Sequence, residues 1–438
     1  MTFKMDTHTL MDTFTTTGND LDELKNIIEV LNKHTHFVKM KSGDMNLLSL
    51  IGEGKRDIIN GEGKKEKDVE VIENLYLIPG SLPTSSLSTP FDSVIKAYRK
   101  PNMAMGLLDE WVGKTKLAIV YNEKNGSQSF YFTSGNALQT MDRFGISGEC
   151  LLTPCIERDL LLAKRFEKDL GITAIIRQSE DGKFKKIFTI LSDKYAHINQ
   201  NVLFDIIKQI EDAGEMGKCK CYSWEISNFF TKLYIEFPKK AEELSTLYGL
   251  STEMIPGILI TTSDTGDASF SVKGTWRAKG SNSVTVHTEV KRKHSGKVDI
   301  NELIEDVTNK IFVEYAKLPE ALCNLMTHDI TDPAWDLKKS EGIKANQAEI
   351  ENVYKTVFKR LGIVKAIGKK AEKVLRQAMV DEINPAIRYT AYDICMLIMT
   401  LPERVVFMDK DKDISSLQKA CGQAAFIDYD TDTTVVLT

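Results

Sequence analysis

The chain has 438 residues, which suggests roughly two to four domains at about 100–200 residues each. Its hydrophobic content of 42% and charged content of 27% are those of an ordinary globular protein with its own buried core. The net charge of −5 excludes a uniformly basic surface, so a nucleic-acid-binding role requires a local basic patch.

The seven cysteines are scattered and odd in number, which argues against a secreted disulfide framework. Cys219 and Cys221 are too close together for the usual zinc pair and are expected to be buried free thiols. No stretch approaches the ~18 consecutive apolar residues of a membrane span. We therefore expect a protein of the cytoplasm with no membrane partner.

The N-terminal part predicts an arm, a helix and a loop. Residues 1–18 are polar and Thr-rich, and we expect a flexible or partner-bound arm. Asp20 or its neighbour Asn19 can cap a helix that ends near Lys33. Residues 52–67 carry Gly, Lys and Glu without periodicity, which predicts a solvated loop.

Strand signals dominate the middle of the chain. An alternating run predicts a strand at residues 69–78, and a Pro/Ser/Thr-rich linker follows it at 79–90. A hairpin turns at Asn125-Gly126 between strands at 111–121 and 128–132. Short helices are predicted at residues 136–144 and 157–170, and a further strand and helix at 232–237 and 239–248.

Residues 172–213 give the densest set of signals. Two apolar strands flank the turn Glu180-Asp181-Gly182, and a helix with an apolar stripe starts near Asn201. Strands at 257–262, 269–276 and 283–290 then predict an antiparallel meander.

Helices dominate the rest of the chain. One is predicted around residues 303–312, and three more follow at 350–361, 367–379 and 389–401. The pattern predicts an α+β fold with an antiparallel sheet core, packed helices and a helical C-terminal region. We expect three regions, at residues 1–68, 69–330 and 331–438.

A basic loop is the main candidate for binding. It lies between a strand and a helix, where backbone N–H groups and the helix dipole favour phosphate. The preceding hairpin adds a tryptophan and an arginine, a combination that suits single-stranded nucleic acid. Two lysines in the segment at residues 172–213 would extend this row of phosphate-binding side chains. The predicted nucleic-acid-binding residues are Lys185, Lys186, Trp276, Arg277, Lys279, Lys291, Arg292, Lys293, His294 and Lys297.

Residues 263–267 leave two interpretations open. Their oxygen-bearing side chains could hold a divalent ion, but a tight turn explains the same sequence. His294 near Asp264 or Asp267 could form an acid/base pair, and metal-assisted cleavage through Asp264 is the least favoured reading. We predict no metal and no cofactor.

Three short segments resemble a known family. Residues 188–195 (FTILSDKY) with Ile198-Asn199, then residues 263–266 (SDTG) and 293–296 (KHSG), are similar in order and spacing to motifs of the phage/plasmid-like protein family of unknown function. The likeness runs from about residue 70 to 330. It implies a bacteriophage or plasmid origin and supplies no catalytic residues. Genes of that family often lie among phage DNA-metabolism genes, which favours a nucleic-acid role.

Two functional hypotheses follow. The first is a non-catalytic phage-type protein that binds single-stranded nucleic acid in recombination or replication, and that forms homo-oligomers. The second is a self-assembling structural protein of a shell or virion, in which the N-terminal arm and the polar loops become ordered on assembly.

Overall fold

The computed structural model describes two β-sheets with helices packed against them. The described parts of the chain are residues 3–59, 65–78, 107, 110, 116–140, 144–145, 156–195, 197–214, 216–242, 254–265, 269–279, 285–292, 300–313, 317, 320, 373, 375, 390–400 and 416–422. The α+β class predicted from the sequence is confirmed.

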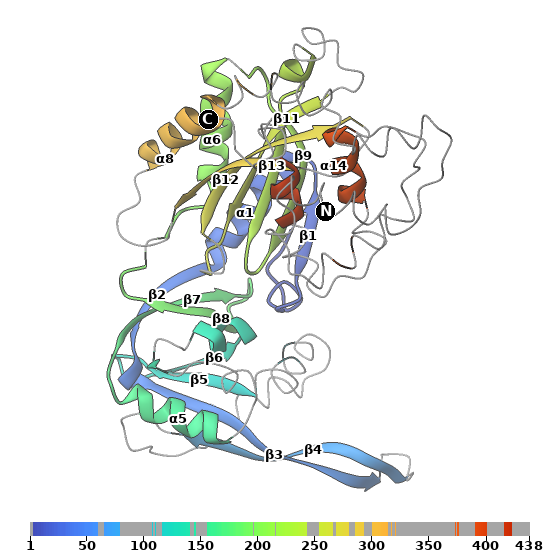
Figure 1. Ribbon diagram of the computed structural model, residues 1–438. Helices are drawn as coiled ribbons and strands as arrows, with labels where there is room; N and C mark the ends of the chain where they lie inside the picture. Colours follow the sequence, from blue (N-terminus) through green and yellow to red (C-terminus); the bar gives the residue numbers. More distant parts are fainter. Residues whose placement is uncertain are drawn as a thin grey trace.

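The first sheet has six strands in the order β1-β9-β10-β11-β12-β13, and every neighbouring pair is antiparallel. It occupies the upper part of Figure 1. Its strands are β1 (Thr15–Gly18), β9 (Lys220–Ser227), β10 (Thr231–Glu236), β11 (Met254–Thr262), β12 (Phe270–Ala278) and β13 (Thr285–Arg292).

The second sheet has seven strands in the order β2-β7-β8-β6-β5-β3-β4, in which only β6 and β8 run parallel. It lies below the first sheet in Figure 1. Its strands are β2 (Thr35–Lys41), β3 (Met45–Ile59), β4 (Lys65–Ile78), β5 (Leu117–Asn122), β6 (Gln128–Thr133), β7 (Gly171–Gln178) and β8 (Lys185–Ser192).

The second sheet is an insertion into the first. β1 pairs directly with β9, with Thr16 opposite Ile226, yet all strands from β2 to β8 lie between them in the sequence. The chain therefore starts in the first sheet with β1 and enters the second sheet at β2. Met5 and Leu10 are buried in the larger core, so a packed segment replaces the expected flexible or partner-bound arm.

Helices α1 (Leu21–His34), α6 (Val202–Ala213) and α8 (Ile300–Val307) pack into the larger core with the six-stranded sheet. Asp20 caps α1 as predicted, since its Oδ1 accepts from the backbone N–H of Asp22 at 2.8 Å and of Glu23 at 3.3 Å. A π-helical turn (Thr308–Phe312) continues α8. Burial of the apolar stripes of these helices supplies most of their stability.

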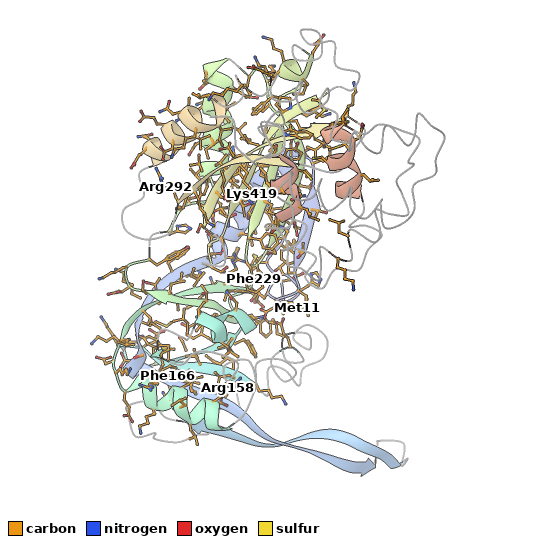
Figure 2. All side chains as sticks on the ribbon, in the orientation of Figure 1. Met11, Arg158, Phe166, Phe229, Arg292 and Lys419 are labelled. Carbon is orange, nitrogen blue, oxygen red and sulfur yellow. The ribbon has the colours of Figure 1, made fainter. Side chains whose placement is uncertain are left out.

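A second core lies against the seven-stranded sheet. It contains side chains of α4 (Gly135–Thr140) and α5 (Ile156–Phe166) together with apolar residues of β3, β5, β7 and β8. A short 3₁₀ helix (Ser42–Asp44) leads into β3. Figure 2 shows Phe166 at α5, with Met11 and Phe229 higher up, between the two sheets.

β3 and β4 form a long two-stranded ribbon. β3 pairs with β5 only over Met45–Ser49, whereas its pairing with β4 runs on to Ile59 opposite Lys65. Figure 1 shows the ribbon extending away from the rest of the sheet. The predicted solvated loop at residues 52–67 is therefore wrong over most of its length, because strand pairing continues through it.

The predicted central unit and meander are confirmed. β7 and β8 flank a turn in which Gly182 has φ +67°, and Gly126 has φ +81° in the β5–β6 hairpin. β11, β12 and β13 follow as antiparallel neighbours. Helix α14 (Ala391–Thr400) matches the last predicted helix. The two predicted helices before α14 lie outside the described residues, apart from single positions.

Within the described residues, no helix is long and apolar enough to cross a membrane.

Candidate functional site

Trp276 and Arg277 belong to β12, but neither is open to a ligand. Trp276 is fully buried in the larger core. Arg277 donates from Nε to Oε1 of Glu236 at 2.8 Å, and its guanidinium lies 4.4 Å from the ring centroid of Tyr222. These positions correct the prediction that Trp276 and Arg277 stack on or pair with bases, since Trp276 is enclosed and Arg277 is already paired.

Lys185 and Lys186 lie on opposite faces of β8. Lys186 is 1% exposed, forms a close ion pair with Glu110, and lies 2.9 Å from the Asp12 carboxylate. Its Nζ also donates to the carbonyl of Leu10 at 3.0 Å. Only Lys185, which is half-buried, remains near the surface. The prediction that both lysines extend a phosphate track is corrected for Lys186, whose charge is neutralised inside the protein.

The last strand carries the start of the predicted basic loop. Arg292 is paired with Asp306 and lies 3.6 Å from Glu302, both on α8. Figure 2 shows Arg292 beside α8. Lys291 and Lys279 are exposed. Lys293, His294 and Lys297 lie outside the described residues. Among the predicted cations of this strand, Lys291 keeps the exposure that a phosphate contact needs.

The six-stranded sheet has an apolar face and a polar face, because side chains alternate along each strand. Residues such as Trp224, Leu233 and Ile258 belong to the larger core on the apolar face. The intervening positions in β9–β13 carry charged and aromatic side chains instead. We define the polar face by Glu225, Lys232, Tyr234, Glu236, Leu259, Lys273, Arg277, Glu289 and Lys291.

Four lysines gather on or beside the polar face, and we name them the lysine cluster: Lys232, Lys273, Lys291 and Lys419. Burial lowers the pKa of Lys273, and the charges of the other three lysines lower it further, against the opposing effect of Glu289. Lys419 comes from the helical segment at residues 416–422 and appears over the sheet in Figure 2. Like charges at this spacing create a positive potential that an anion would relieve.

Carboxylates compensate only part of this charge. Glu225 lies 3.2 Å from the Nζ of Lys232, and Glu289 lies 4.0 Å from that of Lys273. Across the described part of the chain, Lys291 and Lys419 have no carboxylate partner. The polar face therefore keeps a local excess of positive charge on a protein that is acidic overall.

Aromatic rings lie among these charges. The Nζ of Lys232 is 4.3 Å from the ring centroid of Phe230, and the rings of Tyr222 and Tyr234 meet edge to face at 5.2 Å. Phe230 and Tyr222 are half-buried. Rings beside cations form a surface that can accept both bases and phosphates.

A cavity of about 540 Å³ opens beside β1 at one side of the polar face. Four strands line it, and the lining includes Thr17, Ser223, Lys232, Tyr234 and Leu259. Small-molecule sites in proteins typically have volumes of about 300–1,000 Å³. The cavity shares Lys232 with the lysine cluster, so the two features are continuous.

A buried polar network joins the two sheets around Asp264. Its carboxylate accepts from Nε2 of Gln200 at 2.5 Å and lies 3.2 Å from Nε2 of His197, while the Tyr195 hydroxyl donates to the Asp264 carbonyl at 3.1 Å. Arg177 of β7 is fully buried nearby. Burial lowers the pKa of Arg177, and the charge of Asp264 opposes that effect.

Asp264 contacts a histidine that the sequence did not single out. This residue is His197, and its ring centroid lies 4.0 Å from that of Phe37. The expected acid/base pairing of His294 with Asp264 or Asp267 stays a prediction. His294 and Asp267 lie outside the described residues. With both carboxylate oxygens engaged, Asp264 serves to hold the sheets together.

The described residues contain no cluster of three or more His, Cys, Asp or Glu side chains that could hold a metal ion. Cys219 and Cys221 are free and half-buried. Burial raises the pKa of Cys219 to about 12 and that of Cys221 to about 11, so both stay protonated thiols at neutral pH. Cys150 and Cys155 lie outside the described residues.

Two of the three segments that carry the family resemblance meet in the Asp264 network. Residues 188–195 end at Tyr195, which donates its hydroxyl hydrogen to the backbone of Ser263 and Asp264. The sequence order placed these segments far apart, so only the fold reveals that they are in contact. No protein-family model, curated protein or solved structure matches the chain.

Proposed function

We propose that the protein binds single-stranded nucleic acid on the polar face of the six-stranded sheet and catalyses no reaction there. The observation that carries the proposal is the lysine cluster, whose positive charge is only partly compensated by carboxylates and lies near the rings of Phe230 and Tyr222. Phosphates would contact the lysines, and unpaired bases would contact the rings. The family resemblance supports a role in phage recombination or replication.

This site differs from the one expected from the sequence. It keeps Lys291 and adds Lys232, Lys273 and Lys419 as phosphate-contacting residues, without Lys186. The rings of Phe230 and Tyr222 take the place of Trp276 and Arg277 beside the bases. The rings favour single strands over duplex, because bases in a duplex are stacked on each other.

Salt dependence and charge reversal test this proposal. Three or four phosphate contacts on a single strand predict a slope of about −2 to −3 in log K against log salt concentration. The measurement is fluorescence anisotropy of a labelled oligothymidylate titrated with the protein. For the variant Lys273→Glu with Lys291→Glu, we expect affinity to fall at least about tenfold at low salt.

The matched control carries the same charge change on remote helices. Lys25→Glu with Lys208→Glu alters exposed lysines of α1 and α6, which pack on the apolar side of the sheet. We expect the control to bind nearly as tightly as the unaltered protein. Equal affinities for the two double variants would refute the polar face as the binding site.

A second candidate function is self-assembly into a shell or virion, and the β3–β4 ribbon favours it. Beyond Ser49, β3 pairs only with β4 among the described residues. A lone two-stranded ribbon is marginally stable in water. Docking of the ribbon on a neighbouring copy of the chain would supply the missing support.

Shortening the ribbon tests assembly. Residues 52–73 can be removed by joining Ile51 to Asn74, which are cross-strand partners, through an Asn-Gly turn. If the protein assembles through the ribbon, the unaltered chain should form large particles in dynamic light scattering and negative-stain images, and the shortened chain should not. Particles that persist without the ribbon would contradict this function, as would their absence from the unaltered protein.

A further inference from the structure

We infer that the cavity beside β1 binds an unpaired nucleobase of a polynucleotide whose phosphates contact the lysine cluster. This inference rests on the proposed function and deepens it. It assigns a base-binding pocket to the site, in addition to a track for the backbone. Such a pocket would favour single strands because only an unpaired base can enter it, whereas charge alone does not distinguish single strands from duplex.

The cavity has the size and wall chemistry that a base requires. Its volume of about 540 Å³ exceeds what one base needs and leaves room for the sugar. Tyr234 and Leu259 supply an apolar floor, and Thr17, Asn19 and Ser223 supply hydrogen-bonding groups along its walls. Glu225 also lines the cavity, where its carboxylate is paired with Lys232. A base presents an apolar face and polar edges, which match such a floor and such walls.

The floor depends on a glycine. A Cβ at position 257 would overlap the backbone oxygen of Ile235 on β10 and would lie 2.9 Å from Cε2 of Tyr234. The absence of a side chain at Gly257 therefore lets β10 and β11 approach each other closely, with the Tyr234 ring against Gly257. A larger residue at position 257 would displace this part of the cavity lining.

The cavity and the lysine cluster are connected by neighbouring strand positions. Lys232 lines the cavity and belongs to the cluster. Leu259 on the cavity floor pairs in register with Lys273, and Ser223 pairs with Tyr234. A strand of nucleic acid that crosses β10 to β13 would therefore place its phosphates on the lysines while one base enters the cavity.

The experiment fills the cavity and compares two probes. Ser223 is exposed and lines the cavity, so Ser223→Trp should occupy it with an indole that a strand tolerates well. The probes are a labelled oligothymidylate and an abasic deoxyribose-phosphate oligomer of the same length. Gln128→Trp, at an exposed position of β6 in the seven-stranded sheet, serves as the matched control. Circular dichroism with a thermal melt verifies that each variant folds.

We expect the unaltered protein and the Gln128→Trp control to bind the oligothymidylate about tenfold more tightly than the abasic oligomer, which is the range of a single base contact. Ser223→Trp should remove this difference and leave the abasic affinity unchanged. Thymidine monophosphate should compete only weakly, because it lacks the further phosphates that the lysine cluster would bind.

The outcomes separate this inference from the proposed function. If the unaltered protein binds neither probe, the proposed function fails. If it binds both probes and Ser223→Trp still prefers the oligothymidylate, the cavity is not the base site although the polar face still binds nucleic acid. If thymidine monophosphate competes as well as the oligomer, the cavity binds free nucleotide and its link to the lysine cluster is refuted.

Discussion

At the scale of single residues, the buried charges are the most constrained part of the molecule. Lys186 is enclosed with Glu110 and Asp12, and it also donates to the carbonyl of Leu10. A buried ion pair contributes little compared with an apolar replacement of the whole pair, but removal of one partner leaves the other charge uncompensated. Lys186 therefore neutralises the charges of Glu110 and Asp12.

Lys186→Met should destabilise the protein by about 3–5 kcal/mol, because it leaves two buried carboxylates without their cation. Urea unfolding followed by circular dichroism measures the change. Lys185→Met on the neighbouring, half-buried position is the matched control and should stay within about 0.5 kcal/mol. A similar loss in both variants would show that the network around Lys186 is not the cause.

The same pair of lysines shows what the sequence could and could not predict at this scale. Adjacent residues in a strand face opposite sides, so Lys185 and Lys186 could never both lie on one track. That rule was available from the sequence. The sequence does not reveal that Glu110, more than 70 residues away, lies next to the inner side of β8. This carboxylate makes that side suitable for a lysine.

At the scale of elements, β1 illustrates how a short strand is fixed by a close contact. A Cβ at position 18 would overlap the indole ring of Trp224, which lies opposite in register on β9. Trp224 in turn donates from Nε1 to the carbonyl of Asp20 at 2.8 Å. The absence of a side chain at Gly18 thus lets β1 pack directly against Trp224 of the larger core.

Gly18→Ala should push β1 away from β9 and expose Trp224 to solvent. We expect a red shift of tryptophan fluorescence and a loss of roughly 1–3 kcal/mol in unfolding free energy. Gly171→Ala in β7 is the control, since a Cβ there would meet its nearest atom at an ordinary 3.7 Å. An unchanged emission spectrum for Gly18→Ala would contradict the close packing of β1.

Several elements could be read from the sequence and others could not. The hairpins with glycine turns and the amphipathic helices were predicted, because local chemistry determines them. β9 was not predicted, although Trp224 and Ile226 alternate with polar residues in it. The ribbon was missed because Gly, Lys and Glu in residues 52–67 are typical of loops, and its strand pairing compensates for that composition.

At the scale of the whole molecule, the Asp264 network is the clearest link between the two sheets. It brings together Arg177 of β7, the segment that ends in Gln200, and the turn after β11. Asn228 adds to it by pairing with Arg177 and donating to the carbonyls of Thr9 and Met11. No local sequence pattern predicts such a network, since its members come from distant segments.

Asp264→Asn should lower the unfolding free energy by roughly 3 kcal/mol, because Arg177 would lose the carboxylate that offsets its buried charge. Thermal and urea unfolding measure the loss. Asp205→Asn, an exposed carboxylate on α6, is the control and should have little effect. If both variants unfold alike, Asp264 does not hold the sheets together.

The pairing of β1 with β9 across the whole of the second sheet has a consequence for biosynthesis. As the chain leaves the ribosome, Thr15–Gly18 emerges first, and its partner Lys220–Ser227 becomes available only after every strand from β2 to β8 has been made. Such distant pairing is slow to form. The seven-stranded sheet can thus fold during translation, while the six-stranded sheet, which carries the polar face, must be completed late. A nascent or truncated chain would therefore lack the polar face even when the seven-stranded sheet is already folded.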